Sequence, residues 1–69
     1  MTIADCKTGS IVETLHGGGL PTGNVYRVEN VCDNNRRYAW QSFRQGKVKL
    51  HVSVSCRLVE YPDTLAYQF

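Results

Sequence analysis

The sequence predicts an all-β domain, folded as a small five-stranded barrel or as a strongly curved antiparallel sheet. Turn-forming residues recur at short intervals, and the runs between them are rich in β-branched and aromatic residues. No stretch shows the apolar spacing of a helix. The 69 residues suffice for a single domain with one core. We expect strands at residues 10–15, 25–31, 37–43, 47–55 and 57–61.

The first half of the chain holds two of these strands, separated by a long loop. In the first strand, Ile11 and Leu15 compete with Val12 for the inner face, so its orientation stays open. Residues 16–24 are rich in glycine and include a proline, which predicts a loop. In the second strand, charged and apolar residues alternate, which sends Tyr26 inward.

A turn and a hairpin follow. Asp and Asn tolerate left-handed backbone, so residues 33–36 predict a turn. The next two strands form the clearest hairpin of the chain, because Val48, Leu50, Val52 and Val54 alternate with polar residues. Residues 9–61 should form the barrel, preceded by a loose N-terminus at residues 1–8 and followed by a C-terminal strap or interface segment at residues 62–69.

The hairpin can close in two ways. A two-residue loop at residues 45–46 places Trp40 beside His51 on the outer face. A three-residue loop at residues 44–46 places Trp40 beside Leu50 in the core. We favour the second closure, because it requires left-handed backbone only at its final glycine. The predicted core is then Val12, Tyr26, Val28, Tyr38, Trp40, Val48, Leu50, Val52, Val54 and Leu58.

This order of strands and loops resembles that of SH3-like small barrels, in which a long first loop precedes a three-strand meander and a short last strand. Residues 20–28, which read LPTGNVYRV, also resemble a phrase found in small barrel proteins of phages and mobile elements. The resemblance covers residues 9–61. It implies a fold used to bind peptides, nucleic acids or proteins, and it carries no functional residue over to this chain.

Positive charge is concentrated in the predicted hairpin. No acidic residue lies between Asp33 and Glu60, whereas most of the eight basic residues do. Cations neutralise phosphates and an exposed aromatic ring stacks on a base, so we expect this hairpin to contact nucleic acid. The residues predicted to make the contact lie on this hairpin and are Arg36, Arg37, Phe43, Arg44, Lys47 and Lys49. The plainer alternative is a solvated strand whose charges prevent edge pairing.

The C-terminal segment supports a hypothesis of another class. If it does not fold back on the body, its large side chains form an exposed apolar patch, and such patches mark interfaces. The residues of this predicted protein interface are Tyr61, Leu65, Tyr67 and Phe69. The partner would be a second copy of the chain or another protein, as for an inhibitor encoded by a phage or mobile element. The alternative is a strap that closes the barrel.

The sequence offers no constellation for catalysis. Residues 16–19, His-Gly-Gly-Gly, are similar to the oxyanion loop of lipases, but the G-x-S-x-G nucleophile elbow is missing. The same loop leads into a strand and lacks the lysine of a phosphate-binding loop. The 3 cysteines and 2 histidines are not arranged in the close pairs of structural zinc sites. We therefore expect a protein that is not an enzyme and has no cofactor or metal.

The sequence also gives an expectation for the cellular location of the protein. No apolar run has the length of a membrane span, and the N-terminal residues lack the apolar core of a signal peptide. We expect a cytoplasmic protein without membrane contact. The odd number of cysteines then predicts reduced thiols.

Overall fold

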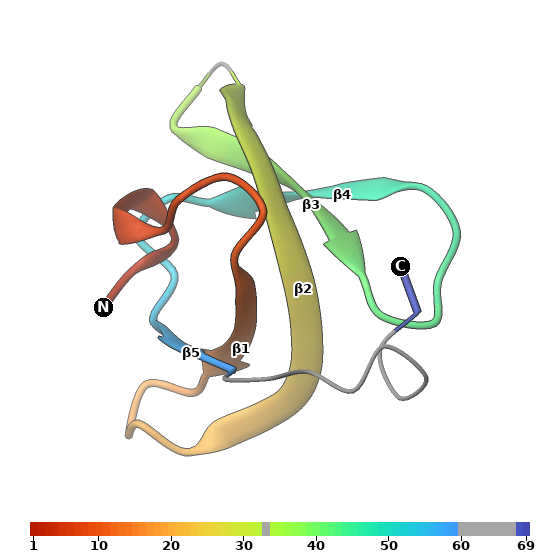
Figure 1. Cartoon of the computed structure of the whole chain (residues 1–69). Coiled ribbons are helices and arrows are strands. Elements are labelled where there is room, and N and C mark those ends of the chain that lie inside the picture. The colour runs from red at the N-terminus through yellow and green to blue at the C-terminus, as the bar shows by residue number, and fades with distance from the viewer. Residues whose placement is uncertain (33, 60–67) are drawn as a thin grey trace.

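The computed structural model of the protein describes residues 1–32, 34–59 and 68–69. Within these residues, five antiparallel strands form one sheet in the order β4-β3-β2-β1-β5 (Figure 1). The strands are β1 (Ile11–Leu15), β2 (Pro21–Cys32), β3 (Arg36–Gln41), β4 (Lys47–His51) and β5 (Cys56–Leu58). A short 3-10 helix, η1 (Ile3–Asp5), precedes them. The predicted all-β class with five antiparallel strands is confirmed.

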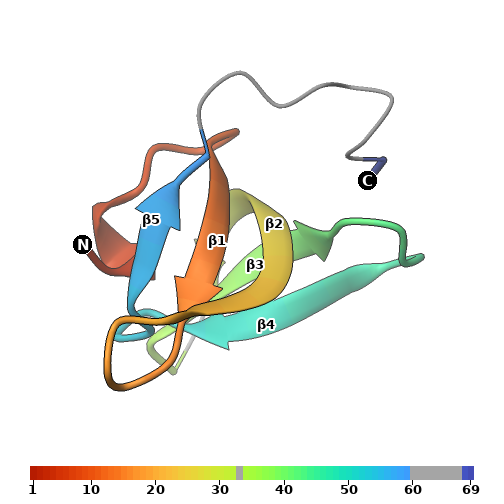
Figure 2. The same cartoon turned by 90° about the horizontal axis from the view of Figure 1, so that it is seen from below.

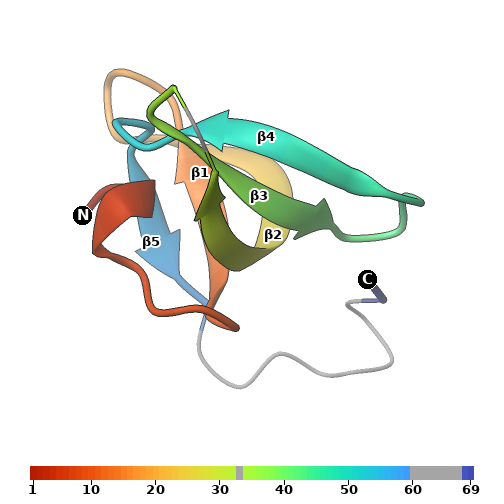
Figure 3. The ribbon, with the colours of Figure 1, turned by 90° about the horizontal axis from the view of Figure 1, so that it is seen from above.

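Strand β2 gives the sheet its curvature. It is 12 residues long and pairs with both β1 and β3. The pairing register of β2 shifts on both sides. Against β1 the shift lies between Glu13 and Leu15 of β1, and against β3 it lies between Val28 and Val31 of β2. Such irregularities bend a strand and increase its twist. Figures 2 and 3 show β1 and β5 on one side of the molecule and β3 and β4 on the other, with β2 linking the two halves.

The hydrophobic core is small and is built mainly from short side chains. Its buried members are Ile3, Cys6, Val12, Tyr26, Val28, Ala39 and Cys56. The partly buried residues packed against them are Val48, Leu50 and Val54. The full burial of Val12 settles the orientation of β1 that the sequence left open. The core prediction is wrong for Leu58, which is 49% exposed because it ends β5, an edge strand of the described sheet.

The N-terminal segment is part of the folded body, so the expectation of a loose N-terminus over residues 1–8 is wrong. Ile3 is completely buried. Its amide donates a 3.0 Å hydrogen bond to the carbonyl oxygen of Val54, and the amide of Ala4 donates one of the same length to Val52. The physical reason is that the segment between β4 and β5 offers free carbonyl groups, while the core accepts one more aliphatic side chain.

The β3–β4 hairpin adopts neither of the two closures considered from the sequence. Its register places Trp40 opposite Lys47, Tyr38 opposite Lys49 and Arg37 opposite Leu50. The connection is therefore longer, and it contains left-handed backbone at Phe43 as well as at the predicted Gly46. This register reverses the expected faces of β3, because side chains alternate along a strand.

The two aromatic residues of β3 consequently leave the core. Tyr38 and Trp40 are half-buried on the outer face, whereas Arg37 and Ala39 are buried. The prediction that Tyr38 and Trp40 are core residues is therefore wrong, as is the prediction that Arg37 faces outward. Ala39 is completely buried on the inner side, whereas the larger rings of Tyr38 and Trp40 lie on the outer side.

The turns agree with the predictions from the sequence more closely than the ends of the strands do. Asn34 and Asn35 have φ angles of 58° and 56°, as expected for residues that tolerate left-handed backbone. The first loop is shorter than predicted, because β2 begins at Pro21. Strand β4 stops at His51, whose ring accepts a 3.1 Å hydrogen bond from the amide of Ser53 and so turns the chain. No helix among the described residues is long and apolar enough to cross a membrane.

Candidate functional site

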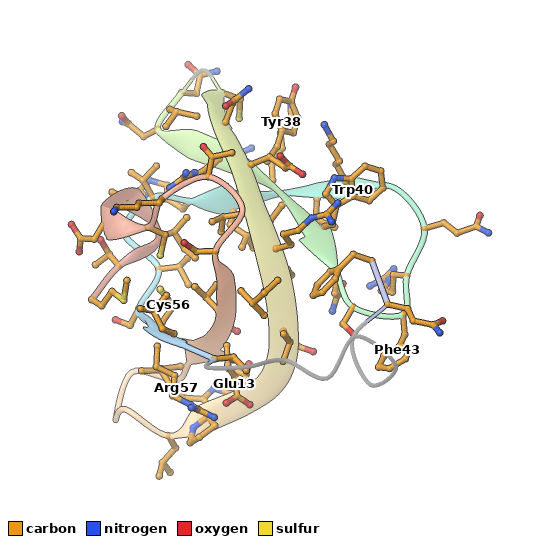
Figure 4. The ribbon with its side chains drawn as sticks, viewed as in Figure 1. Glu13, Tyr38, Trp40, Phe43, Cys56 and Arg57 are labelled. Carbon is orange, nitrogen blue, oxygen red and sulfur yellow. The ribbon has the colours of Figure 1, made fainter. Side chains whose placement is uncertain are left out.

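The outer side of the β3–β4 hairpin carries a group of aromatic and basic side chains. The register places alternate residues of β3 and β4 on this side. Arg27 of β2, which is paired with Trp40, lies on the same side. We call this surface the basic aromatic face; it consists of Arg27, Arg36, Tyr38, Trp40, Lys47 and Lys49. Figure 4 shows Tyr38 and Trp40 next to each other along β3.

The two lysines of β4 lie close to the two rings. The Lys47 ammonium is 5.4 Å from the centre of the Trp40 ring and 5.8 Å from that of Tyr38. The Lys49 ammonium is 5.7 Å from the centre of the Tyr38 ring. Both lysines are exposed. Exposed cation–π contacts are weak, so these ammonium groups are free to move to a stronger partner such as a phosphate.

Arg27 joins this face to the C-terminal end of the chain. Its guanidinium carbon lies 5.6 Å from the centre of the Phe69 ring. Its Nε lies 3.6 Å from a carboxylate oxygen of Glu29, which neutralises part of its charge. The backbone is fixed nearby as well, because the amide of Phe43 donates a 2.6 Å hydrogen bond to the carbonyl oxygen of Gln68.

A hollow of about 460 Å³ opens where the loop after β3 meets the C-terminal residues. We call it the terminal hollow. Its lining residues are Trp40, Phe43, Arg44, Gln45, Gly46, Gln68 and Phe69. The hollow thus shares Trp40 with the basic aromatic face. Phe43 is 67% exposed and has a φ angle of 64°, which is rare for a bulky residue.

The structure separates the residues predicted to contact nucleic acid into three groups. Lys47 and Lys49 lie together on the basic aromatic face, with Arg36 farther along the same side of β3. Phe43 and Arg44 lie on the connecting loop, beside the terminal hollow. The remaining predicted residue does not reach the surface.

Arg37 is that residue, and its prediction as a nucleic-acid contact is wrong. It is only 4% exposed. Its guanidinium donates hydrogen bonds to the carbonyl oxygens of Glu29, Ile3 and Cys6, and to the hydroxyl of Thr8. These acceptors consume the hydrogen-bonding capacity that a phosphate would need.

Sequence reasoning missed Tyr38 and Trp40 as surface residues. The signal was present, because the two-residue closure of the hairpin already placed Trp40 on the outer side. That closure and the observed one differ in loop length but orient β3 in the same way.

The predicted protein interface can be followed only in part. Tyr61, Leu65 and Tyr67 lie outside the described residues. Phe69 is described and is half-buried, with Arg27 over its ring and the terminal hollow beside it.

The cysteines and histidines do not gather into a metal site. In the part of the chain that the structure describes, no group of three or more His, Cys, Asp or Glu residues could hold a metal ion. The thiols of Cys6 and Cys56 do meet, with a sulfur-to-sulfur distance of 3.7 Å, and both are buried. Burial, together with the hydrogen bond between the two thiols, raises the pKa of Cys56 to about 12.

No protein-family model, curated protein or solved structure matches this chain. The resemblance to SH3-like barrels therefore stays a prediction. The geometry and chemistry of the basic aromatic face are the basis for assigning a role to the protein.

Proposed function

We propose that this protein is a non-enzymatic binding module that contacts nucleic acid through its basic aromatic face. The observation that carries the proposal is the juxtaposition of Tyr38 and Trp40 with the ammonium groups of Lys47 and Lys49 on one side of the sheet. Charge supplies affinity for the phosphate backbone, and aromatic rings supply flat platforms for bases.

The lysine side chains suit both the free and the bound state. In the free protein their ammonium groups lie over the rings and partly cover them. On binding, the ammonium groups would move to phosphates, a charge-assisted contact stronger than an exposed cation–π contact. The rings would then be uncovered for stacking, while the lysine stems keep their apolar contacts.

The distribution of acidic residues also supports the proposal. Among the described residues, Glu13 is paired with Arg57, and Figure 4 shows this pair on β1 and β5, away from Tyr38 and Trp40. Glu29 is paired with Arg27, so it neutralises part of the charge of one of the four basic residues of the face. The face therefore keeps a net positive charge, which attracts polyanions.

Trp40 provides a direct test, because it is the single tryptophan of the chain. Titration with a single-stranded oligonucleotide at low salt should quench its fluorescence, and a parallel anisotropy titration should report binding. The affinity should fall steeply as salt is raised. Binding without a change in Trp40 emission would place the contact elsewhere, and no binding at low salt would remove the proposal.

A matched pair of variants tests the role of charge. Lys49→Gln and Lys7→Gln remove the same charge, the first from the basic aromatic face and the second from the exposed segment before β1. Lys49→Gln should weaken binding and lower the slope of log affinity against log salt by about 1. Lys7→Gln should change neither. Equal effects would show that only the overall charge of the protein matters.

A second candidate function is binding to a protein, including a second copy of this chain. The exposed ring of Phe43 beside Phe69 favours it, since exposed aromatic residues are enriched at interfaces. Deletion of residues 64–69 followed by sedimentation analysis tests this candidate. A loss of assembly or partner capture would support an interface, whereas unchanged assembly with a lower melting temperature would support a strap.

A further inference from the structure

We infer that the terminal hollow receives one unpaired nucleobase, so that the protein prefers single-stranded over double-stranded nucleic acid. This inference rests on the proposed function and adds the form of nucleic acid that is recognised. It is carried by the volume and lining of the hollow, by the backbone at Phe43 and by the position of Trp40.

The hollow has the size and the surfaces that a base requires. Its volume of about 460 Å³ lies within the usual range for small-molecule sites. Three aromatic residues contribute to its lining: Trp40 and Phe43, which are close in sequence, and Phe69 at the other end of the described chain. Aromatic rings bind any base through its π face.

Polar residues complete the match to a nucleotide. Gln45 and Gln68 are part of the lining, and each amide group can both donate and accept hydrogen bonds, as the edge of a base does. Arg44 also lines the hollow, with an Nη1 that donates a 3.2 Å hydrogen bond to the side chain of Gln41. Among the side chains of the described lining, Arg44 is cationic and none is acidic, which suits a ligand bearing a phosphate.

The conformation of Phe43 is a second, independent observation. Left-handed backbone costs free energy for a bulky residue, and so does leaving an aromatic ring 67% exposed. Glycine or asparagine would serve this position better if the loop were only a connection. Strained residues of this kind cluster at ligand sites, where the surrounding structure holds them. Here the hydrogen bond from the Phe43 amide to Gln68 holds it.

Trp40 connects the hollow to the rest of the site. It belongs to the basic aromatic face and also lines the hollow. A strand whose bases stack on Tyr38 and Trp40 can therefore continue into the hollow with its next base. The bases of a duplex are already paired and stacked, so a duplex must first be opened before one of its bases can enter.

The experiment uses the full chain and three labelled probes of equal length. The probes are a thymidine strand, an abasic deoxyribose-phosphate strand and a DNA duplex, and binding is measured by anisotropy at low salt. Phe43→Asn is the test variant, because asparagine accepts the left-handed backbone while it removes the ring. Leu20→Asn is the control, since Leu20 is equally exposed, at 68%, in the first loop. Thermal melting confirms that each variant is folded.

We expect the parent protein to bind the thymidine strand on the order of tenfold tighter than the abasic strand and the duplex. Phe43→Asn should lose most of that difference and keep only the part that stacking on Tyr38 and Trp40 supplies, while Leu20→Asn should behave as the parent. If Phe43→Asn proves unfolded, Phe69→Ala takes its place with the same expectation.

Two contrary results have different meanings. If the parent binds the thymidine and abasic strands equally well, the base-binding role of the hollow is wrong, and the proposed function stands on charge alone. If the parent binds none of the probes at low salt, the proposed function fails and the inference fails with it. Self-association that Phe43→Asn abolishes, in a protein that does not discriminate bases, would also overturn the inference and assign the hollow to a second copy of the chain.

Discussion

The guanidinium of Arg37 in β3 donates a 2.9 Å hydrogen bond to the carbonyl oxygen of Ile3 in the N-terminal 3-10 helix. The same nitrogen also donates to the carbonyl oxygen of Cys6. One buried side chain thus binds the carbonyl groups of Ile3, in the short helix, and of Cys6, directly after it. It also fixes the N-terminal segment against the sheet. Arg37 is therefore a structural residue, although its sequence context is that of a basic surface.

Replacement of Arg37 by alanine should destabilise the protein by about 3 kcal/mol, because the hydrogen bonds that its buried guanidinium donates are lost. Urea unfolding measures this change. Arg36→Ala is the matched control, since Arg36 is the neighbouring residue with the same charge but is exposed. We expect Arg36→Ala to change stability by no more than about 0.5 kcal/mol. Similar small losses in both variants would show that the buried network contributes little.

Cys6 and Cys56 are positioned to form a cross-link under oxidising conditions. Their sulfur atoms are 3.7 Å apart, so a small side-chain movement brings them to the bonding distance of about 2.05 Å. With oxidised glutathione as oxidant, the two thiols give up two protons and two electrons, and the oxidant becomes two reduced glutathione molecules. We expect an intact mass lower by two hydrogen atoms and a stability gain of about 3 kcal/mol.

Peptide mapping and two variants test this cross-link. Cys32→Ser should still form it, because Cys32 is not part of the pair. Cys56→Ser should not form it and should gain no stability from the oxidant. A cross-link that includes Cys32, or a protein that becomes less stable on oxidation, would contradict the expected geometry.

The raised pKa of Cys56 predicts a loss of stability at alkaline pH. Burial moves this pKa from an ordinary value of 9.0 to about 12. Between these values the folded protein holds a proton that the unfolded chain has released, so the free energy of unfolding falls as pH rises. The contribution of Cys56 is complete below about pH 9 and is lost towards pH 12.

Denaturant unfolding of the parent and of Cys56→Ala, measured across this range, isolates the effect. The parent should lose stability more steeply than the variant, by at most about 1.4 kcal/mol per pH unit. Tyr26, whose pKa is also raised by burial, contributes in the same direction to both proteins and cancels in the comparison. Parallel curves would mean that the thiol ionises in the folded state as readily as in the unfolded chain.

The ion pair between Arg57 and Glu13 should contribute little to stability. Arg57 donates to the same carboxylate oxygen through Nη2 at 2.6 Å and through Nε at 2.9 Å, across the β1–β5 pairing. The Arg57 side chain is 55% exposed, however, so water and salt screen the interaction. Arg57→Ala should cost about 0.5 kcal/mol at low salt and less at high salt. A double-mutant cycle with Glu13→Gln that gives a much larger coupling would show that the pair holds β5 in place.

The sequence predicted the fold class because period-two alternation and turn residues are local signals. Val48 and Leu50 alternate with lysines, and Asn34 and Asn35 carry their own preference for left-handed backbone. The burial of Ile3 could not be predicted from such local signals. It depends on carbonyl groups of a segment far along the chain, which no local pattern reveals.

The candidate site was predicted only in outline. The concentration of basic residues pointed to the β3–β4 hairpin, but the register decides which residues of β3 reach the surface. If the register of β3 shifts by one residue, each side chain moves to the opposite face of the sheet. Tyr38 and Trp40 then change places with Arg37 and Ala39 between the outer and the inner face. The loop length that sets this register depends on the unusual backbone at Phe43, which composition does not predict.

The burial of Ile3 also constrains how the protein is completed during synthesis. Ile3 leaves the ribosome early, yet its bonding partners on Val54 and Arg37 emerge much later. Until then, a nascent chain has the strands of the β2–β3 hairpin but lacks the carbonyl groups of Val52 and Val54, to which the amides of Ala4 and Ile3 donate. Contacts between distant parts of a chain form slowly. The N-terminal segment is therefore synthesised early but packs against the sheet late, after the residues around Cys56 have left the ribosome.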